Sequence, residues 1–439
     1  PAQFTVWVAV LALSFVFGTD SGQCASSNSG DEGVCLSTND FTPKEDACWT
    51  TKPIRTITPE ELSVEAFYQN YTTEPLIIKG LATKWEATKW TFSSLREKCK
   101  ETFIMTLGYT RDHWGSLGSE EWLDMDGFTR YMEGGYNHQR DWQERRYGFD
   151  YNLLDRCPSL SRDFKIPKYF SHCVLQKGER EDAASELNNI RYFWPTMMAG
   201  PPSTRSEVHY DDDGLPFWMA LLSGRKVFRV LTPKNNPSLI HHPSHPNENE
   251  ENEQDQERRG WPGLSGDMIS SIIPRAFHHA SESYGFEIFR PEGYIEEYPE
   301  LCDLVTHEGI LEAGDVIYIP NSSPHGAVNL EATIAITANY ASPLDEVQMQ
   351  YYKLLCEDMP DRGLCLKLSE RPSYSSFREM DYFEYAGYTL ERWCHDRLQA
   401  YTNAYEQEQL DDDLRGKANA LSSFCRDQGV DIDDVMPSS

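Results

Sequence analysis

The sequence predicts a mainly β fold, a β-sandwich or β-barrel with flanking helices, followed by a helical region at the C-terminus. From Tyr147 to about Pro343, short apolar or alternating runs follow one another, separated by Pro and Gly. No regular helical crossovers lie between these runs, which argues against a parallel sheet. With 439 residues, 39% of them hydrophobic and 12% aromatic, the chain can bury a sizeable core.

The first residues predict entry into the secretory pathway. Residues 4–17 form an apolar run that is too short to span a bilayer comfortably, and small and polar residues follow it. We therefore expect residues 1–24 to be a signal peptide and residues 25–50 a polar N-terminal tail, with no stable membrane span after cleavage. The usual positive segment before the apolar run is missing and the first residue is Pro1, so we expect the sequence to be truncated at its start. An uncleaved signal anchor is the alternative to a signal peptide.

The cysteine content suits the same route. Eleven cysteines run from Cys24 to Cys425 without a Cys-x-x-Cys pair, which favours disulfides in an oxidising compartment over a zinc site. The sequon at Asn70 predicts glycosylation, whereas a glycan at the second sequon, Asn321, would lie close to His325 and the site described below. We expect the protein in the lumen of the endoplasmic reticulum or secreted.

The formal net charge of -30 makes nucleic acid an unfavourable partner, because phosphate binding depends on clustered Lys and Arg. Basic peptides or proteins would be attracted instead. An acidic surface also keeps a secreted protein soluble, which is the simpler interpretation of the charge.

The pattern before the β region predicts helices around one buried strand. Residues 58–62 combine a capping Thr, Pro at the first helical position and early acids, which favour a helix start. Residues 75–78 are predicted as a buried strand and residues 92–99 as a helix. An amphipathic helix is expected over residues 122–132, with its apolar residues on one face.

Five strands are expected in the β region, and helices are expected after it. An acidic, polar run at residues 247–257 interrupts the strands and predicts a solvated insert within residues 235–260. The C-terminal region, residues 346–439, is predicted to be helical and stapled by Cys356, Cys365, Cys394 and Cys425. The expected strands are 191–195, 216–222, 226–231, 315–319 and 332–339; the expected helices are 344–357, 376–385 and 390–408.

Three residues predict a metal site. His209 and Asp211 form a His-x-Asp pair, and His325 lies where an apolar run passes through a proline-containing turn into another apolar run. Two imidazoles and one carboxylate are the ligand set of a non-haem Fe(II), which leaves positions for a co-substrate and O₂. Any one of twelve histidines is more often a core or surface group, but the set together, with Lys226 seventeen residues after His209, favours a metal. The histidines at 241, 242, 245, 278 and 279 are expected to be loop residues.

Several stretches at ordered spacing resemble one family. Together with the metal-site residues, they resemble the JmjC-domain Fe(II)/2-oxoglutarate oxygenases, most closely the branch of arginine demethylases and lysyl hydroxylases. The resemblance implies a double-stranded β-helix, a cupin-like jelly roll, over residues 51–345 with flanking helices. The stretches are 147–150, 163–170, 200–211, 218–226 and 329–339.

The resemblance assigns roles residue by residue. His209, Asp211 and His325 match the iron ligands. Lys226 matches the lysine that binds the distal carboxylate of 2-oxoglutarate, where an ammonium is the compact cation needed. Tyr147 matches a tyrosine whose hydroxyl also holds this co-substrate.

Four further positions line the implied co-substrate pocket. Ser206 occupies a position where the family often has Thr, and Thr337 and Asn339 match polar residues on the far side of the pocket. Met219, seven residues before the lysine, stands where the closest relatives have an Asn. This difference removes a hydrogen-bonding group beside the co-substrate.

The implied function is an Fe(II)/2-oxoglutarate-dependent oxygenase that uses O₂, releases succinate and hydroxylates a protein or peptide side chain. Lys and Arg are candidate targets because the chain is acidic. The alternative is a cupin-like binding module or pseudoenzyme of the secretory pathway, which Met219 and the sequon at Asn321 favour. The C-terminal helices are candidates for a homodimer interface, or alternatively for a cap on the barrel.

Overall fold

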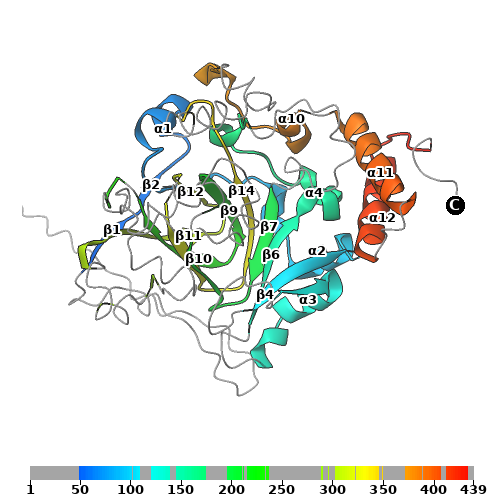
Figure 1. Cartoon of the computed structure of the whole chain (residues 1–439), viewed down its shortest axis with the longest axis horizontal. Coiled ribbons are helices and arrows are strands. Elements are labelled where there is room, and N and C mark those ends of the chain that lie inside the picture. The colour runs from blue at the N-terminus through cyan, green and yellow to red at the C-terminus, as the bar shows by residue number, and fades with distance from the viewer. Residues whose placement is uncertain are drawn as a thin grey trace, which may run out of the picture.

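Two β-sheets face each other in the computed structural model (Figure 1). The model describes residues 49–100, 102–108, 120–138, 145–174, 195–209, 211, 215–232, 234–236, 288–289, 295, 302–321, 323–345, 349, 371–387, 389–406 and 412–433. The smaller sheet has the order β1 (Thr50–Pro53), β11 (Val305–Glu312), β10 (Arg225–Leu231), β13 (His325–Asn329), β8 (Arg205–His209). The larger has the order β2 (Arg55–Ile57), β3 (Leu76–Ile78), β12 (Val316–Ile319), β9 (Phe217–Ser223), β14 (Thr333–Asn339), β7 (Thr196–Gly200), β6 (Arg146–Asn152), β4 (Phe103–Gly108), β5 (Glu120–Asp124).

Strands β7 to β14 form the barrel at the centre of the molecule. Antiparallel pairing joins β7, β14, β9 and β12 in one sheet and β8, β13, β10 and β11 in the other. Successive strands thus alternate between the sheets, apart from the neighbouring pair β10 and β11, which is the arrangement of a double-stranded β-helix. The predicted mainly β fold is confirmed.

The alternation of side chains along each strand separates the barrel interior from its outer face. On β9, Met219 and Leu221 belong to the interior apolar cluster, together with Ile317 and Ala335. Trp218, between them in the sequence, belongs to the cluster outside the larger sheet. Residues at alternate positions therefore point toward the site or toward the surrounding shell.

Helices and aromatic side chains cover the outer face of the larger sheet. Phe170 stacks on Trp218 with ring centroids 5.5 Å apart and lies 5.0 Å from the Tyr340 ring. The helices before the barrel are α1 (Val64–Asn70), α2 (Phe92–Lys98), α3 (Met125–Met132) and α4 (Leu153–Arg156), with short 3-10 helices at Glu86–Lys89, Gly135–His138, Pro158–Arg162 and Lys168–Phe170.

After the barrel, the last two helices lie at the right of Figure 1, where the final one packs against α4. The described helices after the barrel are α10 (Tyr382–Ala386), α11 (Leu390–Glu406) and α12 (Asp412–Asp427), preceded by a 3-10 helix at Tyr374–Ser376. A disulfide joins Cys394 on α11 to Cys425 on α12, as the predicted cysteine staple requires. Asp155 on α4 pairs with Arg397, accepts a hydrogen bond from the Tyr401 hydroxyl at 2.6 Å and lies 3.7 Å from the Lys417 ammonium.

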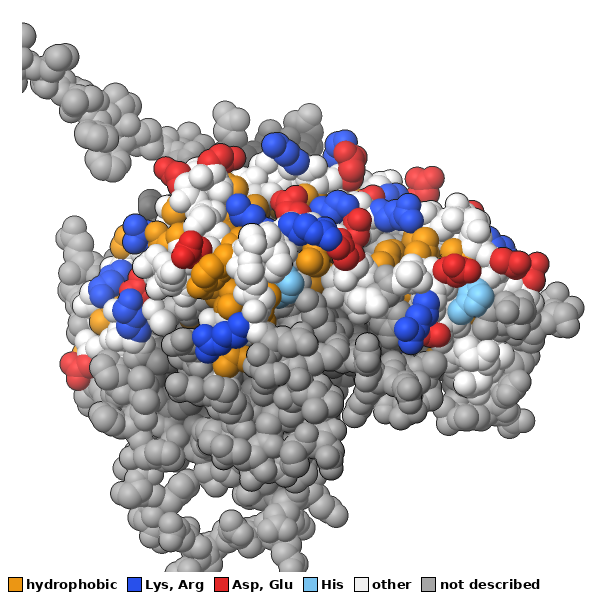
Figure 2. Space-filling model, turned by 90° about the horizontal axis from the view of Figure 1, so that it is seen from above, with side chains coloured by type: hydrophobic (Ala, Val, Ile, Leu, Met, Phe, Trp, Pro, Cys, Tyr) orange, Lys and Arg blue, Asp and Glu red, His pale blue; other side chains and the backbone are white. Residues whose placement is uncertain are grey.

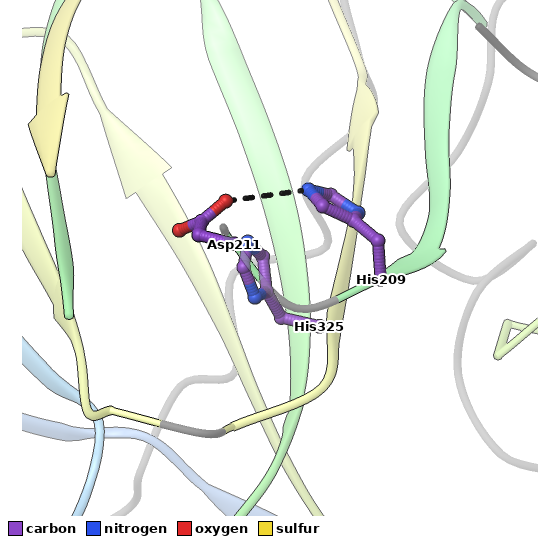
Figure 3. A group of neighbouring side chains, drawn as sticks. All are labelled: His209, Asp211 and His325. Carbon is purple, nitrogen blue, oxygen red and sulfur yellow. Dashed lines mark ion pairs between the residues drawn. The ribbon is translucent and has the colours of Figure 1, made fainter. Parts of the chain in front are cut away.

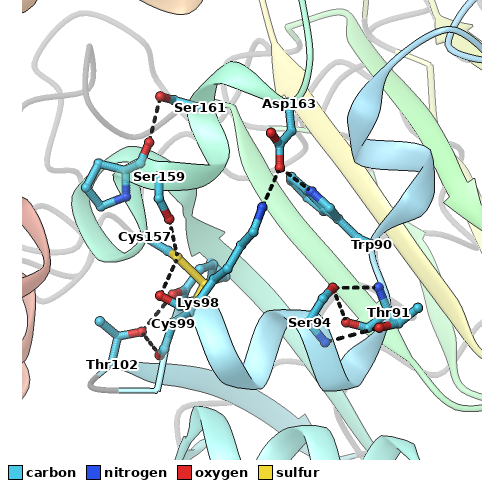
Figure 4. Close-up of a disulfide and its surroundings, with 12 residues drawn as sticks. Trp90, Thr91, Ser94, Lys98, Cys99, Thr102, Cys157, Ser159, Ser161 and Asp163 are labelled. Atoms are coloured by element: carbon cyan, nitrogen blue, oxygen red, sulfur yellow. Dashed lines mark hydrogen bonds and ion pairs between the residues drawn. A yellow bond between two sulfur atoms is a disulfide. The ribbon is translucent and has the colours of Figure 1, made fainter. Parts of the chain in front are cut away.

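A second disulfide, Cys99–Cys157, joins the end of α2 to the residue after α4 (Figure 4). Beside it, the Asp163 carboxylate accepts a hydrogen bond from the Trp90 indole at 2.8 Å and pairs with the Lys98 ammonium at 3.0 Å. A cross-link between residues this far apart stabilises mainly by restricting the unfolded chain. It holds α2 against the segment that follows β6.

Three predicted elements differ from those observed. Residues 58–62 form a turn in which the Glu61 carboxylate bonds back to Thr58, and α1 begins later, at Val64, where the Ser63 hydroxyl caps the Ala66 amide. Residues 122–124 belong to β5, because pairing with β4 outweighs their helical pattern, and the helix starts at Met125. The predicted helix 376–385 is interrupted by a bridge between Met380 and Ile166.

The other predicted strands are confirmed within a residue or two. Residues 191–194 of the predicted strand 191–195 lie outside the described residues, and β7 is described from Thr196. Helix α12 lies within the C-terminal region predicted to be helical, although its bounds were not predicted separately. The predicted signal peptide, tail, acidic insert and most of the helix 344–357 lie outside the described residues, as do Cys356 and Cys365. No helix among the described residues is long and apolar enough to cross a membrane. Figure 2 shows basic and acidic side chains interspersed with apolar ones over the described part of one face.

Candidate metal centre

The three predicted metal ligands meet inside the barrel. His209 ends β8, Asp211 follows two residues later, and His325 begins β13, where the two strands pair His325 with His209. One ligand atom from each residue lies within 4.8 Å of the other two, and the imidazole centroids are 4.5 Å apart. Figure 3 shows the side chains converging, with His209 Nε2 3.8 Å from Asp211 Oδ1.

The surroundings of His325 prepare it as a metal ligand. Its Nδ1 lies 3.0 Å from the Ser323 carbonyl oxygen, which can only accept, so Nδ1 carries the proton and Nε2 keeps its lone pair. Burial, together with the neighbouring His209, lowers the pKa of His325 to about 3. The imidazole is therefore neutral at physiological pH, as coordination requires.

Asp211 provides a test of whether a cation fits. Burial raises the pKa of its carboxyl group, and His209 and the nearby Asn339 amide oppose that rise. The Asn339 amide is near enough to act on the Asp211 charge but not within hydrogen-bond geometry, so among the described residues neither the buried Asp211 Oδ2 nor Asn339 Nδ2 has a hydrogen-bond partner. A buried, unpartnered carboxylate oxygen beside two imidazoles is what a divalent cation would satisfy, and the donor set suits non-haem iron.

Lys226, the predicted co-substrate lysine, is buried in the same interior. Its side chain is 4% exposed, its ammonium donates to the Tyr147 hydroxyl at 3.0 Å, and no carboxylate among the described residues lies within ion-pair distance. Burial lowers the pKa of Lys226 to about 7. The structure thus brings Lys226 and Tyr147 together as a site that lacks an anion.

A polar network next to Lys226 was missed by the sequence reasoning. Asn329 pairs with Lys226 across β10 and β13; its amide donates to the Thr204 hydroxyl at 2.9 Å and accepts from the Thr333 hydroxyl at 3.0 Å. A Cβ on Gly200 would lie 2.3 Å from the Tyr147 ring and 2.6 Å from the Asn329 amide, so only glycine allows this packing. Asn329 follows His325 by four residues, an even spacing that places both on one face of a strand.

The remaining predicted pocket residues have structural partners. Ser206 Oγ accepts from the Ala327 amide at 3.0 Å, at an irregularity where β8 and β13 shift register. The Thr337 hydroxyl donates to the Trp218 carbonyl at 2.9 Å. Met219 is 2% exposed, pairs with Thr337 across the sheet and packs in the interior apolar cluster. Co-substrate contacts by Ser206, Thr337 and Asn339 stay predictions.

A double-stranded β-helix that gathers two histidines and an aspartate on its inner face defines a cupin-type protein with a candidate non-haem metal centre. The chain belongs to the cupin-like domain family, whose model matches residues 64–346. It is 24% identical over 292 residues to the arginine-specific demethylase JMJ22 of Arabidopsis thaliana, covering 64% of this chain and 45% of that protein.

Two animal proteins are similarly related. The bifunctional arginine demethylase and lysyl-hydroxylase psr-1 of Caenorhabditis elegans is 24% identical over 294 residues, which cover 66% of this chain and 61% of psr-1. The lysine-specific demethylase 8 of Danio rerio is 24% identical over 287 residues, covering 63% of this chain and 55% of that protein. These relatives confirm the resemblance to JmjC proteins. The chain spans about half the length of the curated relatives it matches.

Proposed function

We propose that this protein is an Fe(II)/2-oxoglutarate-dependent oxygenase that hydroxylates a protein side chain. The observation that carries the proposal is the presence, in one barrel interior, of the three converging ligands and of a buried lysine without an acidic partner. A metal needs the ligands, and a dicarboxylate co-substrate supplies the anion that Lys226 lacks. The family and its relatives support the same class of reaction.

Polar residues of the barrel interior would bind the metal and the co-substrate, and apolar residues would exclude water. His209, Asp211 and His325 would hold iron, which supplies the oxidation of 2-oxoglutarate and of a substrate C–H bond by O₂. Lys226 and Tyr147 would orient the distal carboxylate through a charge and a hydroxyl. Apolar interior residues such as Met219 and Ile317 keep water from the bound co-substrate.

Lysine or arginine is the proposed target residue. All three relatives described above are named for acting on arginine or lysine, and a formal charge of -30 attracts basic segments. Hydroxylation of a lysine or arginine side chain and demethylation of its N-methyl group both begin with oxidation of a C–H bond. One site can therefore catalyse either reaction.

Purified protein supplied with Fe(II), 2-oxoglutarate and O₂ should form succinate, and His209→Ala should abolish the turnover. His138→Ala changes an exposed histidine at the end of a 3-10 helix and should leave turnover unchanged. Equal turnover in the wild type and in His209→Ala would sink the proposal.

A second candidate is a cupin-like binding module that retains the barrel without efficient oxidation. Met219, which makes the interior next to Thr337 apolar, favours this alternative. Metal analysis separates the two functions. A barrel that takes up no iron and shows no thermal shift with 2-oxoglutarate is a binding module.

We also propose that the protein works in the lumen of the secretory pathway. Two disulfides, Cys99–Cys157 and Cys394–Cys425, support an oxidising compartment, and the exposed Asn70 lies at the end of α1, where its sequon is open to modification. Mass spectrometry of the non-reduced protein from eukaryotic cells should recover both cross-linked peptides and a glycan on Asn70. Recovery of four reduced thiols would contradict the proposed compartment.

A further inference from the structure

A second group of polar side chains lies in the same row of the barrel as the metal ligands. Strand pairing sets Lys52 on β1 opposite His307 on β11, His307 opposite Val230, and Val230 opposite His325. His325 in turn pairs with His209. Val230 belongs to the interior cluster, so the row faces the barrel interior. Lys52, His307 and the nearby Asn235 form what we call the Lys52–His307 group.

A clamped turn after β10 holds Asn235 in place. The side-chain amide of Asn236 donates to the Val305 carbonyl at 2.9 Å and accepts from the Val305 amide at 2.8 Å, which ties the turn to the start of β11. Lys234, in the same turn, pairs with Glu74 at 2.8 Å. Asn235 therefore lies next to His307 in a fixed position, with the charge of Glu74 already matched.

The orientation of the Asn235 amide fixes the proton on His307. The Lys52 ammonium, 3.3 Å away, can only donate, so Oδ1 of Asn235 faces it. Nδ2 then faces His307 Nε2 at 2.9 Å and donates to it. Because Nε2 accepts a hydrogen bond, the neutral imidazole carries its proton on Nδ1.

Neither donor of this group has a charged acceptor among the described residues. His307 is 6% exposed, and among the described residues its Nδ1 has no hydrogen-bond partner. Lys52 is exposed and bonds to a neutral amide, with no carboxylate within ion-pair distance in the described part of the chain. The Lys52 ammonium favours a carboxylate as its ligand, and the His307 N–H is a second donor in the same group.

We propose that the Lys52–His307 group binds an acidic side chain of the substrate polypeptide. His307 and His325 are two strands apart, which is about 10 Å at roughly 4.8 Å per strand. An extended peptide covers about 10 Å in three residues. The substrate therefore has Asp or Glu three residues from the side chain that reaches the metal centre. This inference rests on the proposed function only where it identifies the bound polypeptide as the substrate.

Fluorescence anisotropy with two end-blocked peptides tests the inference. Both have a central Lys in a Gly/Ser background; one has Glu three residues to either side, and the other has Gln there. With Mn(II) in place of iron, so that binding proceeds without turnover, the full-length protein should bind the Glu peptide about five-fold more tightly. Equal affinities, or no binding of either peptide, would overturn the proposal.

Asn235→Asp supplies a decisive variant. It keeps the shape of the side chain but places a carboxylate, which can only accept, against Lys52 and His307. The preference for Glu should therefore disappear, because the new charge pairs with Lys52 and the His307 proton moves to Nε2. Asn403→Asp adds the same charge to the exposed side of α11 and should keep the preference. A preference retained in Asn235→Asp would refute the assignment.

Lys52→Gln covers the case in which Asn235→Asp fails to fold. This change of an exposed side chain should also remove the preference, whereas Lys89→Gln, on a distant exposed pair, should not. Because anisotropy detects binding alone, a Glu preference without succinate formation would refute the proposed oxygenase and keep this site. Succinate formation without a Glu preference would keep the proposed oxygenase and refute the Lys52–His307 group as a substrate-binding site.

Discussion

Lys226 is a cation that folding buries before any anion has bound. Its pKa falls from an unperturbed value of roughly 10.4 to about 7 because burial disfavours the charge. The unfolded chain therefore binds this proton more tightly than the folded protein does. The destabilisation is full below pH 7 and disappears as the pH rises toward roughly 10.

Lys226→Met should consequently stabilise the ligand-free protein, by about 5 °C near pH 6.5 and by progressively less toward about pH 10. Thermal unfolding across this pH range measures the difference. Lys89→Met, which changes a lysine that is 72% exposed, should show no such trend. A stability difference that is independent of pH would contradict the lowered pKa.

The same pKa predicts how 2-oxoglutarate binding depends on pH. A carboxylate ligand binds the protonated lysine, so affinity should fall about ten-fold for each pH unit above 7 until the pKa of the complex is reached. Calorimetric titration of the metal-loaded protein between pH 6.5 and 8.5 would show it. An unchanged dissociation constant over this range would mean that Lys226 does not hold the ligand.

Met219→Asn should strengthen co-substrate binding and lower the stability of the ligand-free protein. Met219 packs in the interior apolar cluster at 2% exposure, so an amide there adds a donor for the ligand but is unsatisfied without it. We expect a KM for 2-oxoglutarate about five-fold lower and a ligand-free stability about 2 kcal/mol lower. Met219→Leu keeps the apolar character and should leave KM unchanged.

At the scale of single strands, one glycine supports co-substrate binding and another supports metal binding, and the two effects are separable. A Cβ on Gly200 of β7 would strike Tyr147 and the network around Asn329, whereas one on Gly326 of β13 would lie 2.8 Å from Ile288 and 3.2 Å from the Ser206 carbonyl, directly after His325. Gly200→Ala should therefore weaken 2-oxoglutarate binding ten-fold or more in rough terms, with metal affinity largely kept. Gly326→Ala should instead reduce metal affinity more than it reduces 2-oxoglutarate binding.

Metal and co-substrate titrations of both variants measure this separation. Gly135→Ala, where a Cβ meets nothing closer than 3.4 Å, serves as the control. If both variants lost both ligands to the same extent, the two halves of the site would not be separable.

The periodicity of the sequence predicted most strands, and its failures have physical causes. Apolar runs mark β9 and β14 because one face of each strand is buried in the interior cluster and the other in the surrounding cluster. Periodicity failed at residues 122–124, whose helical spacing is overridden by pairing with β4. It also failed at Thr58, where a capping pattern closes a turn that does not continue into a helix.

At the scale of the whole molecule, Asp155 fastens the C-terminal helices to the barrel shell. Burial alone would raise the pKa of its carboxyl group, but Arg397 and Lys417 outweigh burial and hold the pKa below its usual range. The ion pair therefore stabilises the fold above the unfolded carboxyl pKa of roughly 3.9, and this contribution is lost as the pH falls through the lower folded value.

Asp155→Asn should destabilise the protein by about 3 kcal/mol at neutral pH, because it leaves a buried guanidinium uncompensated. Urea unfolding would measure the loss, and limited proteolysis should cut α11 and α12 first. Asp396→Asn, which breaks a surface pair with Arg392, should cost less than about 1 kcal/mol. Similar losses in both variants would remove Asp155 from this role.

Contacts between distant segments were beyond sequence reasoning. His209, Asp211 and His325 could be grouped from their residue types and a family pattern, but the pairing of Asn329 with Lys226 follows from strand register. The bond from Lys52 to Asn235 joins residues 183 positions apart, and no periodicity in the chain encodes it. Residue chemistry is readable locally, whereas the partners of each group depend on how the sheets close.

The positions of the disulfides Cys99–Cys157 and Cys394–Cys425, both among the described residues, bear on the evolution of the fold. Cys99–Cys157 and Cys394–Cys425 both join segments of the surrounding shell, and no cysteine occurs in the sequences of strands β7 to β14. The strands of the barrel thus contain no thiol that a change of compartment could oxidise. An ancestral barrel of this kind could pass between reducing and oxidising compartments by exchanging thiols in its outer helices alone, with its inner chemistry untouched.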